Sequence, residues 1–190
     1  MRRPLALTLI LLALAALPAA ADEAPRLTPS ADGRELIDPT AGLAWSRCVE
    51  GMDWDGRRCT GTPRLATHAE ALAMGRARAG AEGRAWRVPR VTELRRLFER
   101  LAHGKSAESL APAAPAGWYW TSTTRIESEK VNAYSYRNVE RGLTQRQVDR
   151  LVVQSGWAVE QPGADVRGDV AKREKLAVRL VRTLDPAPAP

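Results

Sequence analysis

The only two cysteines of the chain, Cys48 and Cys59, stand close together in the sequence. Thiols of the cytoplasm stay reduced, whereas a pair like this one forms a disulfide in an oxidising compartment. Closing a loop of this size stabilises a fold by about 3 kcal/mol, because it restricts the unfolded chain. A Cys48–Cys59 disulfide is therefore expected if the protein is exported.

Acidic residues between the cysteines suggest a cation site at first sight. Asp53, Asp55 and Gly56 match the first positions of a calcium-binding loop, in which alternating carboxylates converge on the ion. No further acid follows before Cys59, so the loop lacks its remaining ligands. A turn closed by the disulfide, with both aspartates in solvent, is the favoured interpretation.

An enzyme would need a nucleophile, an acid–base pair or a set of metal ligands. The two histidines, His68 and His103, have no cysteine or further histidine at metal-ligand spacing. Both are expected to be surface residues near helix ends. The sequence therefore predicts a protein without enzymatic activity, bound metal or cofactor.

Basic side chains in the second half of the chain offer a different chemistry. Four of them and one tryptophan form the candidate ligand-binding patch: Arg125, Lys130, Arg137, Arg141 and Trp157. Guanidinium groups bind sulfate or carboxylate through paired hydrogen bonds, and an indole ring can stack on a sugar. The alternative is a solvated face whose cations are offset by Glu127, Glu129 and Glu140.

Six tryptophans and one phenylalanine supply most of the large aromatic side chains. Four tryptophans are expected in the core, because the interior needs large apolar groups: Trp45, Trp86, Trp118 and Trp120. Trp54 and Trp157 fall in loop-like stretches, where each could stack on a sugar or cover the edge of the core. No dense basic block with interleaved aromatic residues is present, so nucleic acid is not an expected partner.

The start of the chain has the layout of a cleaved signal peptide. Arg2 and Arg3 precede an apolar run from Leu5 to Leu17, and small residues follow up to Ala21. The run is shorter than the roughly 20 apolar residues of a membrane-spanning helix, so no stable span is expected after cleavage. Losing the two arginines lowers the formal net charge from +7 to +5. The predicted location is periplasmic or secreted.

Composition divides the chain into four parts. Residues 1–21 are the predicted signal peptide, and residues 22–33 form a proline-punctuated linker. Residues 34–184 are long enough for one globular domain, and residues 185–190 form a proline- and alanine-rich tail.

Local patterns predict the elements of that domain. Two strands, ELID at 35–38 and LAWSR at 43–47, flank the turn signal DPTAG. A capping box of Thr67 and Glu70 opens a helix over 68–78 that ends at Gly80 or Gly83, and an apolar stripe marks a second helix over 91–101 that ends at Gly104. Three further strands are predicted at 118–123, 132–137 and 176–183.

Residues 138–175 are harder to assign. A helix from Thr144 through Val153 followed by a loop is the favoured interpretation, and strands at LVVQ and GWAVEQ are the alternative. With either choice the elements indicate an α+β domain.

Several motifs occur in a shared order with tryptophans in most of them: DPTAGLAWSRC, DWDGRRCTG, THAEALA, GRAWRVPRVTELRRL, WYWTST and LAVRLVR. In this respect the chain resembles the family named for the C-terminal domain of the Legionella collagen-like adhesin. The motifs span 38–182, which is nearly all of the predicted domain. Two features depart from the family: Arg90 stands where a threonine usually caps the second helix, and 138–175 is longer than usual.

This resemblance implies a C-type-lectin-like fold, with two helices on a small, mostly antiparallel sheet and long loops. It also implies a binding role, since the namesake domain attaches to sulfated glycans. The related formylglycine-generating enzymes use a C-terminal cysteine pair, which this chain lacks. The expected function is recognition of a sulfated or acidic polysaccharide or another cell-envelope component. The alternative is an assembly partner of an envelope protein, contacted through Trp157 and Leu151–Val153.

Overall fold

The computed structural model describes residues 26–103, 110–111, 113–125, 127–130, 136, 140, 149–152 and 154–185. These residues form two helices and four small antiparallel sheets, which confirms the predicted α+β class. The predicted signal peptide and the C-terminal tail beyond Asp185 lie outside the described residues. None of the helices in the described part of the chain is long and apolar enough to cross a membrane.

The first sheet joins both ends of the domain. β2 (Glu35–Asp38) and β3 (Leu43–Ser46) pair as a hairpin, which confirms the two strands expected at the start. β1 (Thr28–Pro29) adds to the outer side of β2, and the last strand, β11 (Val181–Thr183), pairs with β3. Leu27 is buried in the core. Part of the segment predicted as a linker over 22–33 is therefore folded onto the domain.

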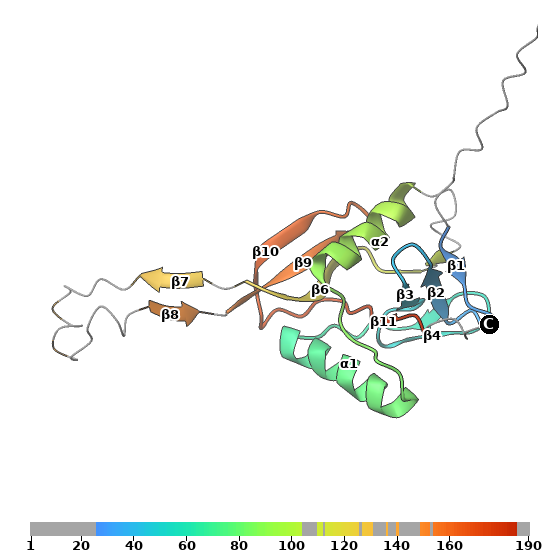
Figure 1. Ribbon diagram of the computed structural model, residues 1–190, viewed down its shortest axis with the longest axis horizontal. Coiled ribbons are helices and arrows are strands. Elements are labelled where there is room, and N and C mark those ends of the chain that lie inside the picture. The colour runs from blue at the N-terminus through green and yellow to red at the C-terminus, as the bar shows by residue number, and fades with distance from the viewer. Residues whose placement is uncertain are drawn as a thin grey trace, which may run out of the picture.

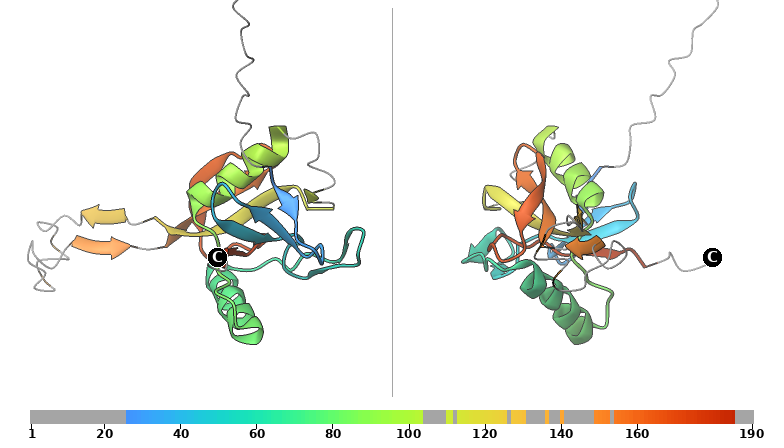
Figure 2. Two further views of the ribbon diagram at one scale, coloured as in Figure 1. Left: turned by 45° about the vertical axis from the view of Figure 1, so that its right-hand side comes forward. Right: turned by 90° about the vertical axis from the view of Figure 1, so that its left-hand side faces the viewer.

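The second sheet has the order β10–β9–β6 and lies between the two helices (Figures 1 and 2). Its strands are β6 (Gly117–Thr124), β9 (Ser155–Gln161) and β10 (Val166–Ala171). Consecutive residues of a strand face opposite sides of its sheet. Tyr119 and Val159 accordingly pack in one core cluster with α2 (Val91–His103), whereas Trp120 and Ala158 pack in a second cluster with α1 (His68–Glu82).

The helices begin and end where local signals place them. At the start of α1 the hydroxyl of Thr67 accepts from the amide of Glu70, and the Glu70 carboxylate accepts from the amide of Thr67 at 2.8 Å. The helix ends at Gly83, whose φ of 65° is left-handed, so it runs four residues beyond the predicted end at residue 78. α2 confirms the apolar stripe, since Leu94, Leu97 and Phe98 are buried.

Arg90 precedes α2 in place of a threonine that could cap the helix. The hydroxyl of Thr123, on β6, instead accepts from the amide of Val91 at 3.1 Å. The Glu93 carboxylate accepts from the amide of Arg90 at 2.7 Å and is held by two 2.8 Å bonds from Arg87. The side chains of Thr123 and Glu93 thus accept hydrogen bonds from the first amides of this helix, which a side chain at position 90 does not do.

The favoured interpretation of residues 138–175 is wrong where the structure describes them, and the alternative, strands at LVVQ and GWAVEQ, is confirmed for the described residues 151–152 and 156–161. In place of a helix through Val153 and a loop, the described residues contain β8 (Asp149–Val152), β9 and β10. β9 is the central strand of its sheet and is buried on both faces, so its sequence lacks the alternation that marks a half-exposed strand. Of the strand predicted at 176–183, only Val181–Thr183 is a strand, and Leu176 and Ala177 form isolated bridges. The strand predicted at 132–137 lies outside the described residues except Tyr136.

β7 (Glu127–Lys130) and β8 form an arm that extends β6 and β9 away from the body of the domain (Figures 1 and 2). In its antiparallel register Glu129 lies opposite Arg150, and Lys130 lies opposite Asp149.

Arg179 connects the C-terminal segment to the N-terminal hairpin. Its side chain is 0% exposed, and Nη1 donates to the carbonyl oxygens of Ser46 at 2.8 Å and Arg47 at 2.6 Å. Burial lowers the pKa of Arg179, while the neighbouring Tyr119 opposes the shift. The bonds to these carbonyls offset part of the cost of burying a cation.

Candidate functional site

The two cysteines are bonded to each other, as predicted. Cys48 and Cys59 have Cα atoms 5.5 Å apart, and Cys59 is the first residue of β5 (Cys59–Gly61), which forms a hairpin with β4 (Met52–Trp54). At its tip Asp55 Oδ1 accepts from the amides of Arg57 and Arg58, both at 2.8 Å, and these bonds lower the pKa of Asp55. Asp55 thus closes a turn, in agreement with the interpretation of this loop. Among the described residues no three His, Cys, Asp or Glu side chains are placed to hold a metal.

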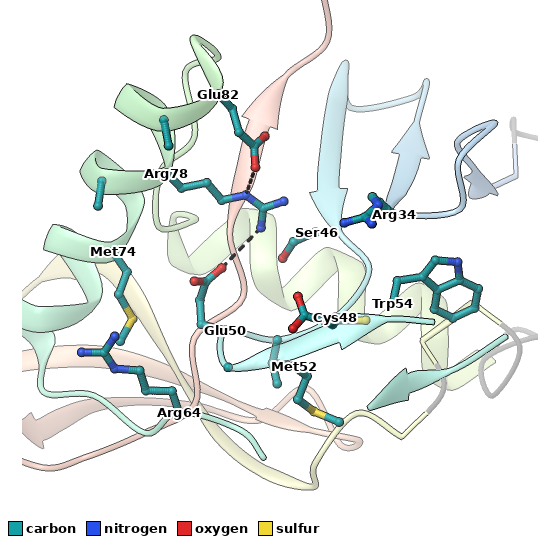
Figure 3. Close-up of a pocket in the computed structure, with 15 residues that line it drawn as sticks. Arg34, Ser46, Cys48, Glu50, Met52, Trp54, Arg64, Met74, Arg78 and Glu82 are labelled. Atoms are coloured by element: carbon teal, nitrogen blue, oxygen red, sulfur yellow. Dashed lines mark hydrogen bonds and ion pairs between the residues drawn. The ribbon is translucent and has the colours of Figure 1, made fainter. Parts of the chain in front are cut away.

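A pocket of about 560 Å³ lies between this disulfide hairpin and the C-terminal half of α1 (Figure 3). Met52 and Trp54 come from the hairpin, Met74 and Arg78 come from the helix, and Glu50 comes from the segment that joins β3 to the hairpin. The volume is within the range of small-ligand sites. Charged groups and apolar walls face the same space.

An ion-pair network holds one side of the pocket in place. Arg78 Nε donates to Glu82 at 2.8 Å, and Arg78 Nη1 lies 3.4 Å from Glu50 Oε1. The guanidinium carbon of Arg78 is 4.1 Å from the centroid of the Trp86 ring, whose Nε1 donates to Glu82 at 2.6 Å. Burial raises the pKa of Glu50, and the positive charge of Arg78 opposes the rise. Arg78 is therefore fixed by three neighbours, whereas Glu50 is held by one long contact.

Arg34 and Arg64 line the same pocket from opposite sides in the view of Figure 3. Both residues are exposed, and in the part of the chain that the structure describes neither side chain is ion-paired with an acid. Buried acids elsewhere have close cationic partners: Arg182 lies 2.7 Å from Glu35, and Arg100 lies 2.6 Å from Asp38. The two pocket arginines are thus available to an anionic ligand.

Comparison with known protein families identifies the domain. The model of the Lcl C-terminal domain matches residues 35–182, from the first residue of β2 into β11. The chain belongs to the Lcl C-terminal domain family. The match covers most of the chain and includes both helices, the disulfide hairpin and the arm. The comparison with curated proteins finds no match.

This Lcl C-terminal domain does not gather the predicted patch at the pocket. Arg125 is exposed directly after β6, where its amide donates to Ser155 at 3.2 Å. Its charge helps to lower the pKa of Asp169, after the larger effect of a hydrogen bond from Arg167. Lys130 lies on the arm opposite Asp149. Arg137 and Arg141 lie outside the described residues.

Trp157 and Trp54 are both half-buried. A Cβ atom added to Gly168 would meet the Trp157 indole at 2.8 Å, so this ring packs on the backbone of β10. Trp54 is covered on one side by the Arg47 guanidinium, 3.7 Å from its ring centroid, at the mouth of the pocket. Trp157 in the Lcl C-terminal domain therefore has a packing role within the second sheet, and Trp54 is the tryptophan closest to a cavity that a ligand can enter.

His68 is not the surface residue that the sequence suggested. Its side chain is 4% exposed, Nε2 lies 3.1 Å from the carbonyl oxygen of Thr121, and its ring meets Trp120 edge-on at 5.2 Å. The first residue of α1 faces the second sheet, which the local sequence does not reveal. Three of the predicted core tryptophans are buried and Trp118 is half-buried.

Sequence reasoning missed the pocket residues Arg34, Glu50, Arg64 and Arg78. One local signal was present, the spacing of Arg78 and Glu82 on successive turns of a helix. The other residues come from segments before β2, after β3 and after β5. No single motif contains them.

Proposed function

We propose that this domain is an extracytoplasmic, non-enzymatic binding domain that recognises an anionic glycan or another acidic component of the cell envelope. The observation that carries the proposal is the pair of exposed pocket arginines, Arg34 and Arg64, neither of which has an acid within ion-pair distance in the described part of the chain. Membership of an adhesin-associated family supports a binding role. The disulfide is consistent with a location outside the cytoplasm.

Charge-assisted contacts from arginine make such binding possible. Each hydrogen-bonded contact to a sulfate or carboxylate contributes roughly 1.5 to 3 kcal/mol before the cost of ordering the groups. Arg125, Lys130, Arg137 and Arg141 remain the predicted second contact region for a long polyanion. Attraction of this kind weakens with salt, since the Debye length shortens from about 10 Å at 0.1 M to about 3 Å at 1 M.

The test is solid-phase binding to a heparin-like polysaccharide between roughly 50 mM and about 300 mM salt. Two charge-reversed variants separate the regions: Arg34→Glu with Arg64→Glu for the pocket, and Arg137→Glu with Arg141→Glu for the predicted patch. Arg76→Glu with Arg96→Glu makes the same change of charge at exposed sites on the two helices and is the control. We expect salt-sensitive binding that the control retains and the pocket variant loses. Binding that survives in both site variants, or that is absent at low salt, contradicts the proposal.

The arm favours a second candidate, an assembly partner of another envelope protein. β7 and β8 pair with each other and extend away from the body as a two-stranded ribbon, and neither outer edge pairs with another described strand (Figure 1). An exposed strand edge can pair with a strand of another protein. A pull-down from envelope extract with the full chain, compared with a chain in which a glycine-serine turn joins Ile126 to Gln154, tests this candidate. Capture that does not depend on the arm contradicts it.

A further inference from the structure

The pocket beside the disulfide hairpin has a mixed but balanced charge. Three arginines and three acids line it: Arg34, Arg64, Arg78, Glu50, Asp53 and Glu82. At neutral pH their formal charges cancel. A ligand unit with one anionic group and several hydroxyl groups can match its separate parts.

Glu50 has unused capacity to accept hydrogen bonds. A carboxylate offers about four acceptor positions, and among the described residues the only side-chain donor to Glu50 is Arg78, at 3.4 Å. Burial has already removed part of the water that would otherwise bind this carboxylate, as the raised pKa of Glu50 indicates. Donors supplied by a ligand would therefore find an acceptor that is poorly satisfied in the free protein.

The neighbouring charges favour hydroxyl donors over an ammonium group. Arg78 lies beside Glu50 and is fixed by Glu82 and Trp86, so it cannot move away when a ligand enters. A hydroxyl donates to the carboxylate and can accept from the guanidinium at the same time. An ammonium group has no acceptor and would be repelled by Arg78.

Apolar groups complete the site. Met52, Met74 and Trp54 line the pocket (Figure 3). The C–H faces of a sugar ring pack well against such groups, and about 560 Å³ is sufficient for one or two sugar residues. Arg64, whose charge acts on Glu50, then remains for an acidic substituent.

We propose that this pocket binds a single acidic sugar residue, with its carboxylate at Arg64 and its hydroxyl groups at the neighbouring Glu50. The inference rests on the proposed function and deepens it, because it names the sugar unit within an anionic glycan that the domain recognises. The site differs from the patch predicted at Arg125 and along the arm.

The deciding experiment is titration of the full chain with three small probes: methyl β-glucuronide, methyl β-glucoside and glycine. Binding is followed by the NMR signal of the Trp54 indole N–H and by calorimetry. We expect the glucuronide to bind at least about tenfold more tightly than the glucoside, since the neutral sugar loses the charged contacts. Glycine is not expected to compete.

Three variants assign the contacts. Arg64→Ala should weaken glucuronide binding by about tenfold, whereas Arg96→Ala on α2 should leave it unchanged. Glu50→Gln should weaken it by only about three- to tenfold, because the amide oxygen still accepts from a hydroxyl. Arg64 is exposed and Glu50 is half-buried, so thermal unfolding should confirm folded variants.

Each other outcome overturns the inference. If the unmodified chain binds the glucuronide and the glucoside equally, the carboxylate has no role in binding. This outcome can be read without any variant. If glycine competes with the glucuronide and Glu50→Gln abolishes glycine binding, the pocket is a site for ammonium groups. If heparin-like polysaccharide binds but methyl β-glucuronide does not, this inference fails and the proposed function stands. If neither binds, the proposed function fails as well.

Discussion

His68 shows how one buried side chain makes stability depend on pH. Its ring meets Trp120 edge-on and makes one hydrogen bond to the carbonyl oxygen of Thr121. A Cβ atom added to Gly156 would lie 3.3 Å from the same ring. Burial lowers the pKa of His68 and the charge of Lys172 lowers it further, while the bond to Thr121 opposes both effects. The neutral imidazole is therefore the form that fits the fold.

The sign of the pH dependence follows from that shift. The pKa of an exposed histidine is about 6.5, so the unfolded chain binds more protons than the folded chain once the pH falls below this value. The contribution of His68 to stability is complete above about pH 7 and decreases as the pH falls through 6.5 towards the lower pKa of the folded state. Urea unfolding between pH 7.5 and 5 should show this decrease for the native sequence and a smaller one for His68→Gln.

His103 provides the control for the histidine prediction, since it is the only other histidine of the chain. His103→Gln should retain the pH dependence of the native sequence. Parallel stability curves for His68→Gln and the native chain would mean that His68 does not contribute. The comparison between variants cancels the effect of the other titrating groups, which every variant retains.

At the scale of one element, the start of α2 depends on a side chain from another strand. Arg90, not a threonine, precedes this helix, and the hydroxyl of Thr123 on β6 accepts from the amide of Val91 instead. Thr123→Val removes the acceptor with little change in shape. We expect a loss of about 1 kcal/mol in the free energy of unfolding, as for other helix caps. Thr124→Val, at the end of the same strand, should change stability by less in the same urea titration.

The disulfide hairpin is a second element whose contribution can be measured. Cys48→Ser should lower the free energy of unfolding by about 2 to 4 kcal/mol, because the unfolded chain regains the freedom that the bond removes. Thermal unfolding of the variant beside the native chain measures the loss. Two reactive thiols in a titration of the native exported protein would contradict the bonded state. Since the hairpin carries Met52 and Trp54, the variant should also bind pocket ligands more weakly.

The elements that were predictable are those whose signals are local. The capping box of Thr67 and Glu70, the left-handed Gly83 and the stripe of α2 each lie within a few residues of the structure that they define. β9 carries a weaker signal, which made a strand only the alternative interpretation, because Ala158 and Val159 are buried in two different clusters and its residues do not alternate between apolar and polar. Its state depends on pairing with β6, which lies far away in the sequence.

At the scale of the whole molecule, the exported protein is expected to lack the first 21 residues of the sequence. The signal peptide expected over residues 1–21 should be removed after Ala21, since small residues at positions 19 and 21 suit the peptidase. The exported protein should therefore begin at Asp22, and intact-mass measurement of protein recovered from outside the cytoplasm checks this. A mass that includes Met1 would contradict cleavage.

The candidate site belongs to the whole molecule as well, which explains why the sequence did not reveal it. Arg34, Glu50, Arg64 and Arg78 are contributed by four separate segments and meet only when the hairpin packs beside α1. The patch at Arg125, Lys130, Arg137 and Arg141 was predicted because its members are close in sequence. Arg125 and Lys130 lie at the start of the arm, and neither lines the pocket. Proximity in sequence therefore did not identify the pocket.

The pairing of β11 with β3 has a consequence for the order of events during synthesis. The ribosome releases the N-terminus first, so β3 is present while its neighbour Val181–Thr183 is still to be made. Until then the edge of β3 is open, and the carbonyls of Ser46 and Arg47 await Arg179. The first sheet is therefore completed, and these two carbonyls gain their donor, only after the C-terminal segment has been made.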